Sequence, residues 1–600
     1  MSKKKATAEP VVAAVTAATP ADLKAKHYHA FSKLAGEILP VRRGKYRVGY
    51  RTIATRKDAR KTFLLAFANV AVEIGFLIWL LHTLFQPIWN ESAAIGGTFI
   101  ALLACIFVIE CFRLVGLITF SLSAIIARDP IPVRPRKGGR VAFTTTIVPS
   151  KEPFEMVEKT LKAMLKVRHD GPYDVWLLDE GNDPDIAEAC HRMGVKHFSR
   201  KGIPKYNMES GRFKAKTKHG NHNAWLVEHG SAYDFILSVD SDHIPHANFA
   251  ERTLGYFRDP DVAYVVGPQV YGNTETLISR GAESQAYVFQ ATIQRAANTY
   301  DAAMFVGTNH AYRVKTMLQI GGFQDSITED LLTGMAVHGS RNPRTGNFWR
   351  SVYTPDVLAI GEGPSSWTDF FTQQLRWARG ANETLLVHFF RMFRKLPLKA
   401  RLHYGLIIWC YPAAAITWSL GIAVSMLYLF LGTTGVGLPD KTWLALYLDV
   451  MATQIILYVW LRRYNVSPHE EKDSFGVSGI IFSIFAAPVY AYALWGTLTR
   501  QKSGFVVTSK GDATSPDNWS TFKFHTFWAT IIATFLAYTI IIGNTHPNVK
   551  IWCAIALASC LSPIILWRIS MLPQTLRKIH EFVHTPIRFS NRLADKGVEI

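Results

Sequence analysis

Apolar and polar positions divide the chain into membrane-like segments and a polar middle block. Residues 62–85 and 93–109 are apolar over about the length that a helix needs to cross a hydrocarbon core of roughly 30 Å. Residues 112–127 either prolong the second of these segments or form one more helix. Further apolar segments follow the middle block at residues 407–431, 443–460, 522–542 and 551–566. The pattern predicts two membrane-spanning helices before the middle block and four after it.

The middle block alternates short apolar runs with helix-like spacing. Phe154, Val157, Leu161 and Leu165 recur three or four residues apart, as on one face of a helix. Apolar runs typical of strands lie at residues 141–148, 173–178, 233–239 and 262–270. Alternation of this kind predicts an α/β domain with a mostly parallel sheet and helices on both faces.

Carboxylates follow two of the predicted strands. Asp179 ends one strand, and the stretch ILSVDSDHIPH places Asp240 and Asp242 after another. In open α/β sheets ligands bind outside the carboxyl ends of strands. Because strand side chains alternate in direction, the two aspartates would share a face and could hold one cation. The alternative is a loop with two solvated acids.

Positive charge is concentrated beside the membrane segments. The formal net charge is +20, and residues 42–61 contain nine Lys and Arg, whereas residues 86–92 contain none. The positive-inside rule then predicts that the N-terminus, the middle block and the C-terminus are cytosolic. A nucleic-acid partner is the competing explanation of the charge, but no nucleic-acid-binding motif accompanies it. The first residues imitate a signal peptide, and we expect a disordered tail instead.

Three further motifs lie downstream. SITED places Glu329 and Asp330 at a predicted helix start, where a carboxylate is either a helix cap or a catalytic base. FFTQQLRWARG places Gln373, Arg376 and Trp377 on one helix face, and the alternative is an interfacial aromatic and basic helix. FVVTSKG, at residues 505–511, is either a lid over a ligand or an ordinary positive loop. Residues 477–498 before it are expected to form an amphipathic helix at the membrane interface.

The motifs DxD, TED, QxxRW and FxVTxK, in this order and interleaved with membrane helices, resemble the processive family 2 glycosyltransferases. The cellulose synthase catalytic subunits show the strongest likeness, over residues 62–566. The resemblance implies a GT-A (Rossmann-like) cytosolic domain inserted between transmembrane helices. The implied parts are a basic N-terminal tail (1–60), N-terminal transmembrane helices (61–128), the GT-A domain (129–366), interface helices (367–400), C-terminal transmembrane helices with an interface helix and a gating loop (401–568), and a basic C-terminal tail (569–600).

The resemblance also implies roles for individual residues. Asp330 would be the general base, with Glu329 beside it. Asp240 and Asp242 would hold Mg²⁺ or Mn²⁺ against the donor diphosphate. The donor side would comprise Asp179, Lys218, Asn221, Asp240, Gln373, Arg376, Thr508 and Lys510. Trp377, Gly307 and Thr308 would contact the acceptor. Glu180 and Val306 depart from the family's commoner Asp and Cys.

The implied activity is processive, inverting transfer of glucose from UDP-glucose to a β-glucan, with export across the plasma (inner) membrane. A β-1,3- or mixed-linkage glucan, or a polymer of the chitin or hyaluronan type, is the alternative product. A membrane transporter or scaffold is the non-enzymatic alternative. The expected partners are UDP-glucose, the growing polysaccharide and the lipid bilayer, without nucleic acid. Whether the chain forms a homo-oligomer or uses accessory export subunits stays open.

Polar residues within the apolar segments are costly unless they face a cavity or another helix. Glu73, Asn69 and Asp449 are candidates for lining a polysaccharide channel. Trp409, Tyr411 and Trp418 are aromatic candidates for the same channel. Hydrogen bonding between helices, or an aromatic belt at the interface, is the alternative.

Overall fold

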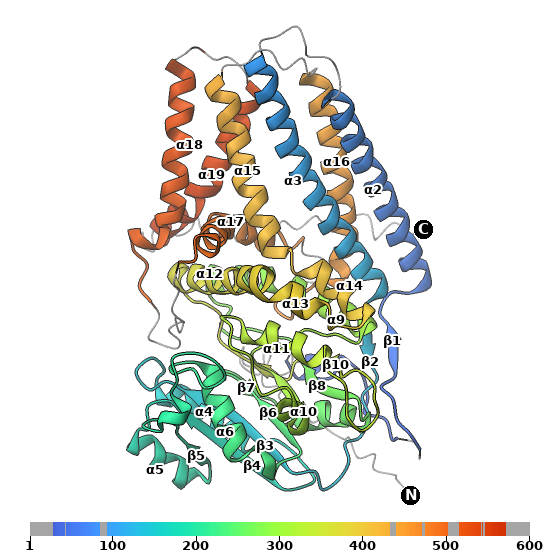
Figure 1. Ribbon diagram of the computed structural model, residues 1–600, viewed down its shortest axis with the longest axis vertical. Helices are drawn as coiled ribbons and strands as arrows, with labels where there is room; N and C mark the ends of the chain where they lie inside the picture. The colour runs from blue at the N-terminus through green and yellow to red at the C-terminus, as the bar shows by residue number, and fades with distance from the viewer. Residues whose placement is uncertain are drawn as a thin grey trace, which may run out of the picture.

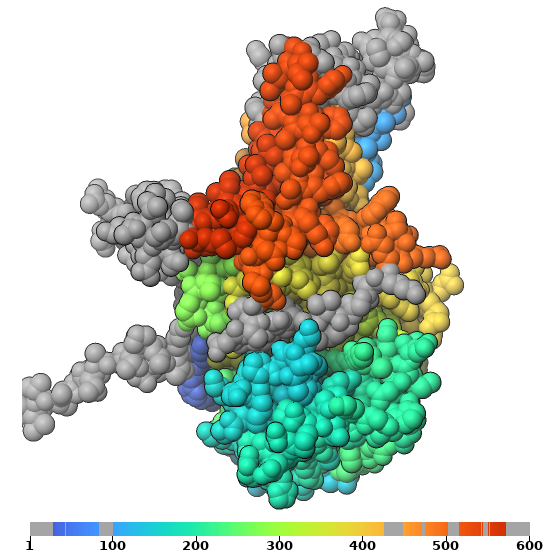
Figure 2. Space-filling model, turned by 90° about the vertical axis from the view of Figure 1, so that its left-hand side faces the viewer, coloured from blue at the N-terminus to red at the C-terminus, as the bar shows by residue number. Residues whose placement is uncertain are grey.

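The computed structural model describes residues 28–41, 44–84, 93–431, 440–470, 475–501, 515–541, 543 and 547–571. An α/β domain forms one end of the molecule, and a bundle of long helices forms the other (Figure 1). Seen from the side, the blue and green residues of the α/β domain lie below the orange and red column of helices (Figure 2). The predicted insertion of an α/β domain between helical segments is confirmed.

A seven-stranded sheet forms the centre of the α/β domain. Its spatial order is β10 (Arg350–Tyr353), β8 (Val262–Val266), β9 (His310–Arg313), β6 (Phe235–Ser238), β3 (Val141–Ile147), β4 (Tyr173–Asp179) and β5 (Lys196–Phe198). All neighbouring pairs are parallel except those of β9, which runs antiparallel to both β6 and β8. The mostly parallel sheet and four of its strands are therefore confirmed, whereas β5, β9 and β10 were not predicted.

Two apolar cores cover the two faces of the sheet because successive strand residues point to opposite sides. Val175 and Leu177 pack with residues of α4 (Phe154–Met164), α5 (Pro184–Met193) and α7 (Phe249–Thr253). Trp176 and Leu178 pack with residues of α6 (Lys218–Glu228), α10 (Val314–Gln319) and α11 (Glu329–His338). The sheet is thus buried on both faces, and its strand ends remain the place where a ligand can enter.

Long upright helices form the bundle in Figure 1. They are α2 (Arg56–Leu84), α3 (Ala93–Ile126), α15 (Cys410–Leu431), α16 (Asp440–Leu461), α18 (Lys523–Ile541) and α19 (Pro547–Ser570). Within the described residues, six helical segments are long and apolar enough to cross a membrane, two before the α/β domain and four after it. They are Arg56–His82, Leu103–Ile126, Leu398–Val424, Val477–Leu498, Trp519–Ile541 and Cys553–Ser570. The span expected at residues 443–460 is not among these six, whereas residues 477–498, expected at the membrane interface, are.

Two helices lie crosswise between the bundle and the α/β domain. In Figure 1, α12 (Trp367–Glu383) runs across the view and α17 (Val477–Leu498) is seen nearly end-on above it. The two helices pack through Phe370, Phe371, Phe482 and Phe485. The prediction that α17 is amphipathic is wrong, because its outward side carries apolar residues such as Ile480, Ile481 and Ile484. Short helices α8 (Leu277–Val288), α9 (Gln294–Ala297), α13 (Phe390–Phe393) and α14 (Leu398–Ile407) complete this layer.

Candidate active site

A cavity of about 1610 Å³ begins at the strand ends of the α/β domain and extends into the helix bundle. Nearly all of the site residues predicted from the motifs line it. They are Lys218, Asn221, Asp240, Asp242, Gly307, Thr308, Glu329, Asp330, Gln373, Arg376 and Trp377. Asp179 does not line it, and Thr508 and Lys510 lie outside the described residues.

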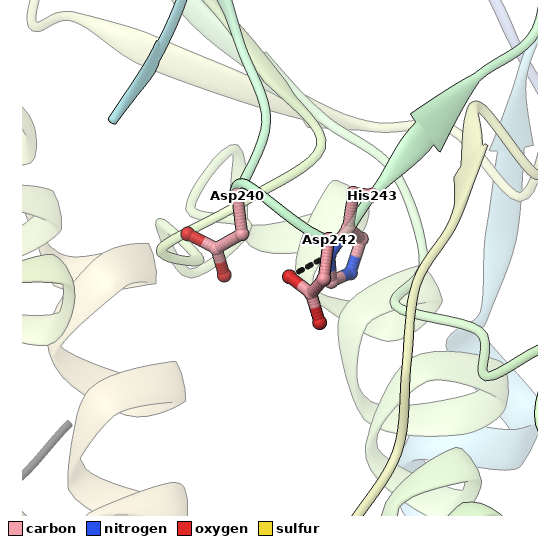
Figure 3. A group of neighbouring side chains, drawn as sticks. All are labelled: Asp240, Asp242 and His243. Atoms are coloured by element: carbon pink, nitrogen blue, oxygen red, sulfur yellow. Dashed lines mark hydrogen bonds and ion pairs between the residues drawn. The ribbon is translucent and has the colours of Figure 1, made fainter. Parts of the chain in front are cut away.

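Asp240 and Asp242 follow β6 and direct their carboxylates toward one space (Figure 3). Strand alternation was the wrong reason to expect this, because β6 ends at Ser238 and Asp242 lies in a turn. A hydrogen bond from the backbone to a side chain fixes the turn: the amide of Asp240 donates to Thr308 Oγ1 at 2.9 Å. Thr308 comes just before β9, so the unpredicted central strand positions the first aspartate.

Lys218 connects the donor side of the cavity to the loop before β9. Its ammonium forms an ion pair with Asp240 and donates to the carbonyl of Gly307 at 2.6 Å. Lys218 begins α6, whose start is capped by Thr217 accepting from the amide of Gly220 at 3.2 Å. A Cβ at Gly220 would overlap the carbonyl of Lys214, so the glycine of the KHGN motif allows this close approach.

The side chains of Asp240, Asp242 and His243 could together hold a metal ion. One ligand atom from each lies within 4.8 Å of the others. His243 Nδ1 and Asp242 Oδ1 are 3.0 Å apart, and His243 Nε2 is buried without a hydrogen-bond partner in the structure (Figure 3). Two carboxylates that leave room for phosphate oxygens fit a hard cation such as Mg²⁺ or Mn²⁺.

Asp179 is used inside its own loop. Its Oδ1 accepts from the amide of Gly181 and its Oδ2 from the amide of Asp183, both at 2.7 Å, and His197 approaches Oδ2 at 3.1 Å. The contacts with His197 and with the two backbone amides lower the pKa of this fully buried carboxyl although burial opposes them. The motif led us to expect Asp179 in the donor site, but its side chain does not line the cavity. Asp179 instead shapes the loop at residues 180–183, which lines the cavity.

Glu180, the departure from the commoner aspartate, forms a partly buried ion pair with Arg200. Its carboxylate contacts the guanidinium of Arg200 at 2.6 Å and 3.0 Å. Arg200 also donates to the carbonyls of Tyr206, Lys214 and Thr217 at 2.9 to 3.1 Å. The longer side chain of glutamate therefore fixes, through Arg200, the loop that leads to Lys218.

Glu329 and Asp330 start α11 and face the cavity. Asp330 Oδ1 accepts from the amide of Leu331 at 2.8 Å. Burial raises the pKa of Asp330, against the lowering effects of the Leu331 amide, Lys218 and Arg376. Burial, and then the charge of Asp330, raise the pKa of Glu329 to about 7. A carboxylate with a raised pKa is a stronger base, which suits proton removal from a hydroxyl.

Helix α12 brings Gln373, Arg376 and Trp377 to the same cavity. Ser366 caps its start by accepting from the amide of Asp369 at 3.1 Å. A Cβ at Gly380 would overlap the side chain of Thr328, so this glycine lets α12 lie directly against the TED motif. The QxxRW and TED motifs, far apart in sequence, are therefore adjacent in space.

The inner part of the cavity is lined from the helix bundle. Trp409 and Tyr411 line it as predicted, whereas Trp418, Asn69 and Glu73 do not. Glu73 instead meets Arg113 of α3 at 3.3 Å and Gln454 of α16 at 3.4 Å, as the helix–helix alternative requires.

Sequence reasoning missed the contribution of α3 and α17 to this wall. Phe112, Val115, Gly116, Thr119 and Phe120 line it from α3. Tyr490 of α17 lines it too, and its hydroxyl donates to Gln374 Oε1 at 2.5 Å. The sequence did offer a clue to Gln374, because it directly follows Gln373 within the QxxRW motif. Nothing in the local sequence singled out Tyr490.

Comparisons with known proteins support the family resemblance. Residues 235–461 match the family described as Glycosyl transferase family group 2. A UDP-forming cellulose synthase of Dictyostelium discoideum is 35% identical over 176 residues, 28% of this chain and 16% of that protein. The cellulose synthase 1 catalytic subunit (UDP-forming) of Komagataeibacter xylinus is 26% identical over 340 residues, 55% of this chain and 42% of that protein.

The chain thus spans less than half the length of these two curated relatives. Among solved structures, a mannosyltransferase from Pyrobaculum calidifontis in complex with GDP-Man and Mn²⁺ covers 74% of this chain and 100% of its own. At 13% identity and a TM-score of 0.39, that similarity is too weak to support an inference. The resemblance to family 2 glycosyltransferases of the cellulose synthase type, drawn from the motifs, is confirmed by the family match and the relatives.

Proposed function

We propose that this protein transfers glucose from UDP-glucose to a growing β-glucan, with inversion at the anomeric carbon, and moves the polymer across the plasma (inner) membrane. The observation that carries the proposal is the continuity of one cavity. It joins the carboxylates of Asp240 and Asp242 to Asp330 and then to Trp409 and Tyr411 within the helix bundle. A site that adds sugars repeatedly needs such a path, because each addition must displace the product away from the donor.

The donor side is formed by groups suited to a nucleoside diphosphate. Asp240 and Asp242, with His243 beside them, would hold Mg²⁺ or Mn²⁺. When bound, this ion supplies positive charge against the diphosphate as it leaves. Arg376 offers a planar guanidinium to phosphate oxygens, and Lys218 offers a compact ammonium. The remaining donor-side residues assigned by resemblance are Asn221, Gln373, Thr508 and Lys510, with Asp179 acting through the loop that it shapes.

The acceptor side is formed around Asp330. Its carboxylate would take the proton of the acceptor hydroxyl while that oxygen attacks the anomeric carbon from the side opposite the diphosphate. The attacking oxygen forms the new glycosidic bond, and UDP leaves with the bonding electron pair, so an α-linked donor gives a β-linked product. Glu329 adjoins the base, and Gly307, Thr308 and Trp377 would position the acceptor sugar.

Orientation in the membrane follows from charge. Lys61 and Arg463, at the ends of α2 and α16 that face the α/β domain, lie on the side predicted to be cytosolic by the positive-inside rule. The α/β domain and both termini are then cytosolic, and the polymer leaves through the bundle. The lipid bilayer and the growing polysaccharide are the expected partners.

The test uses the purified full chain in lipid vesicles with UDP-glucose and Mg²⁺ or Mn²⁺. Released UDP and retained polymer are measured, and the polymer is digested with β-1,4- and β-1,3-specific glucanases. We expect UDP release coupled to a polymer that the β-1,4 enzyme degrades. Degradation by the β-1,3 enzyme would change the linkage assignment, and use of another UDP-sugar would change the sugar. If the folded protein binds UDP but does not cleave UDP-glucose, the enzyme assignment is overturned in favour of a transporter or scaffold.

A further inference from the structure

The outward side of α16 carries a carboxylate among apolar side chains. Asp449 is exposed there, beside Leu448 with 56% of its surface exposed. One and two turns further along the same side lie Ala452, Ile456 and Val459, all exposed. Spacings of three and four residues place Asp449, Ala452, Ile456 and Val459 on one helix face. We call these four residues the α16 face.

Asp449 lies deep within the predicted membrane. Trp460 marks the polar end of α16, because its indole donates to Thr62 at 2.9 Å and its ring contacts Lys61 and Arg463. Asp449 precedes Trp460 by eleven residues, or about 16 Å at the helical rise of roughly 1.5 Å per residue. That distance is about half the thickness of a hydrocarbon core of roughly 30 Å.

Two other described acidic residues of the bundle, Glu73 and Glu110, are paired within the chain, and Asp449 differs from them. Glu73 and Glu110 both contact the guanidinium of Arg113. The structure shows no side-chain partner for Asp449 in the part of the chain that it describes, and only the backbone carbonyl of Asp449 accepts a hydrogen bond, from Thr453 at 3.0 Å. No described residue of α16 lines the cavity, so the channel role expected for Asp449 is wrong.

We propose that the α16 face binds a transmembrane helix of a different protein, one that carries a Lys or Arg side chain at mid-membrane depth. Ionisable groups inside a bilayer are costly and pair with one another, so an outward-facing carboxylate calls for a cationic partner. Ala452 is small enough to let two helix backbones approach closely. Ile456 and Val459 then supply apolar packing on the same side of α16.

A second copy of the chain fits this surface poorly. A two-fold axis along the membrane normal would place the α16 faces of two protomers against each other in parallel. Asp449 would then meet Asp449 of the other copy at the same depth, where two carboxylates repel. The charge on the face therefore selects a basic helix.

The test places a photo-crosslinking amino acid at Ala452 in the full chain, in membranes of the source organism. We expect an adduct with a membrane protein whose transmembrane segment contains Lys or Arg. Replacing Asp449 with Leu should reduce the adduct by about three- to thirtyfold, the range expected for one polar contact between helices. Changing the partner's basic residue to Asp should have the same effect, and combining that change with Asp449→Lys should restore the adduct.

Controls distinguish docking from general membrane effects. The same crosslinker at Ile555, exposed on α19, should give no adduct with that partner. Asp449→Leu should leave UDP release unchanged, since Asp449 lies away from the cavity. Adducts with lipid or a second copy alone, equal adducts with Asp449→Leu, or failure of the charge exchange would each overturn the proposal.

Discussion

Two carboxylate pairs of the same formal charge lie in one cavity but in different surroundings. Asp240 forms an ion pair with Lys218, and Asp242 meets the imidazole of His243 at 3.0 Å. The structure describes no ion pair to Glu329 or Asp330, and burial raises the pKa of both groups. The first pair lies beside an ammonium and an imidazole at the open strand ends, which suits it to a metal ion. Burial instead prepares the second pair to accept a proton.

The largest effect should come from removing the base. Asp330→Asn preserves shape but cannot take the acceptor proton, so we expect the sugar-transfer rate to fall by about 100- to 10,000-fold. The measurement is polymer formation from UDP-glucose in vesicles. Asp185→Asn, at an exposed position on α5, is the control and should retain the normal rate. A loss below about tenfold would show that Asp330 is not the base.

The metal-side pair should respond to metal concentration. Asp242→Asn removes one anionic ligand, and we expect metal affinity to fall by about 10- to 100-fold, as for changes near other metal sites. Activity should therefore be low at limiting Mn²⁺ and partly restored by excess Mn²⁺, which titration of the initial rate will reveal. Excess Mn²⁺ should give no recovery for Asp330→Asn. Full activity of a thoroughly chelated wild-type preparation would contradict the metal assignment.

Lys218 links the two pairs electrostatically. It contacts Asp240 directly, and its positive charge lowers the pKa of both Glu329 and Asp330. Because the base works in its deprotonated form, activity falls as pH drops through the pKa of Asp330. Lys218→Met should raise that pKa further and move the acid limb of the kcat/KM profile to higher pH. An acid limb unchanged or shifted to lower pH would show that Lys218 does not act on the base.

The smallest effect should come from the anchor of α12. Asp517 accepts from the backbone amides of Trp367 and Thr368 at 3.2 Å and 2.8 Å, so it caps the helix that carries Arg376. Asp517→Ala removes a cap worth about 1 kcal/mol, and we expect the transfer rate to fall by about fivefold with UDP affinity little changed. A loss comparable to that of Asp330→Asn would mean that Asp517 acts in the site itself.

The sequence predicted those parts of the fold whose signal is local. Strands β3, β4, β6 and β8 are apolar runs in the sequence and were recognised as such. Strand β9 has only four residues, and its pairing with both β6 and β8 comes from distant parts of the chain. For α17, a helix at the membrane interface was expected from the sequence, but its apolar outward side and its packing against α12 were not.

The candidate site was predictable at the level of motifs and not of contacts. The strand-end position of Asp240 and Asp242 follows from the α/β pattern. Both carboxylate oxygens of Asp179 accept hydrogen bonds from its own loop, from the backbone amides of Gly181 and Asp183. Whether those amides point toward Asp179 depends on the loop conformation, which the sequence pattern does not reveal. Which side of α16 faces outward likewise depends on how the helices pack. From the sequence alone, Asp449 could equally have faced a channel.

Equilibrium binding of UDP tests most directly whether the two carboxylate pairs have different tasks. Asp330→Asn and Asp242→Asn, each purified as the full chain, are titrated with UDP in the presence of Mn²⁺ at a concentration that saturates the wild type. We predict nearly normal UDP affinity for Asp330→Asn and clearly weakened affinity for Asp242→Asn. Lost UDP affinity in Asp330→Asn together with unchanged affinity in Asp242→Asn would contradict this division of roles.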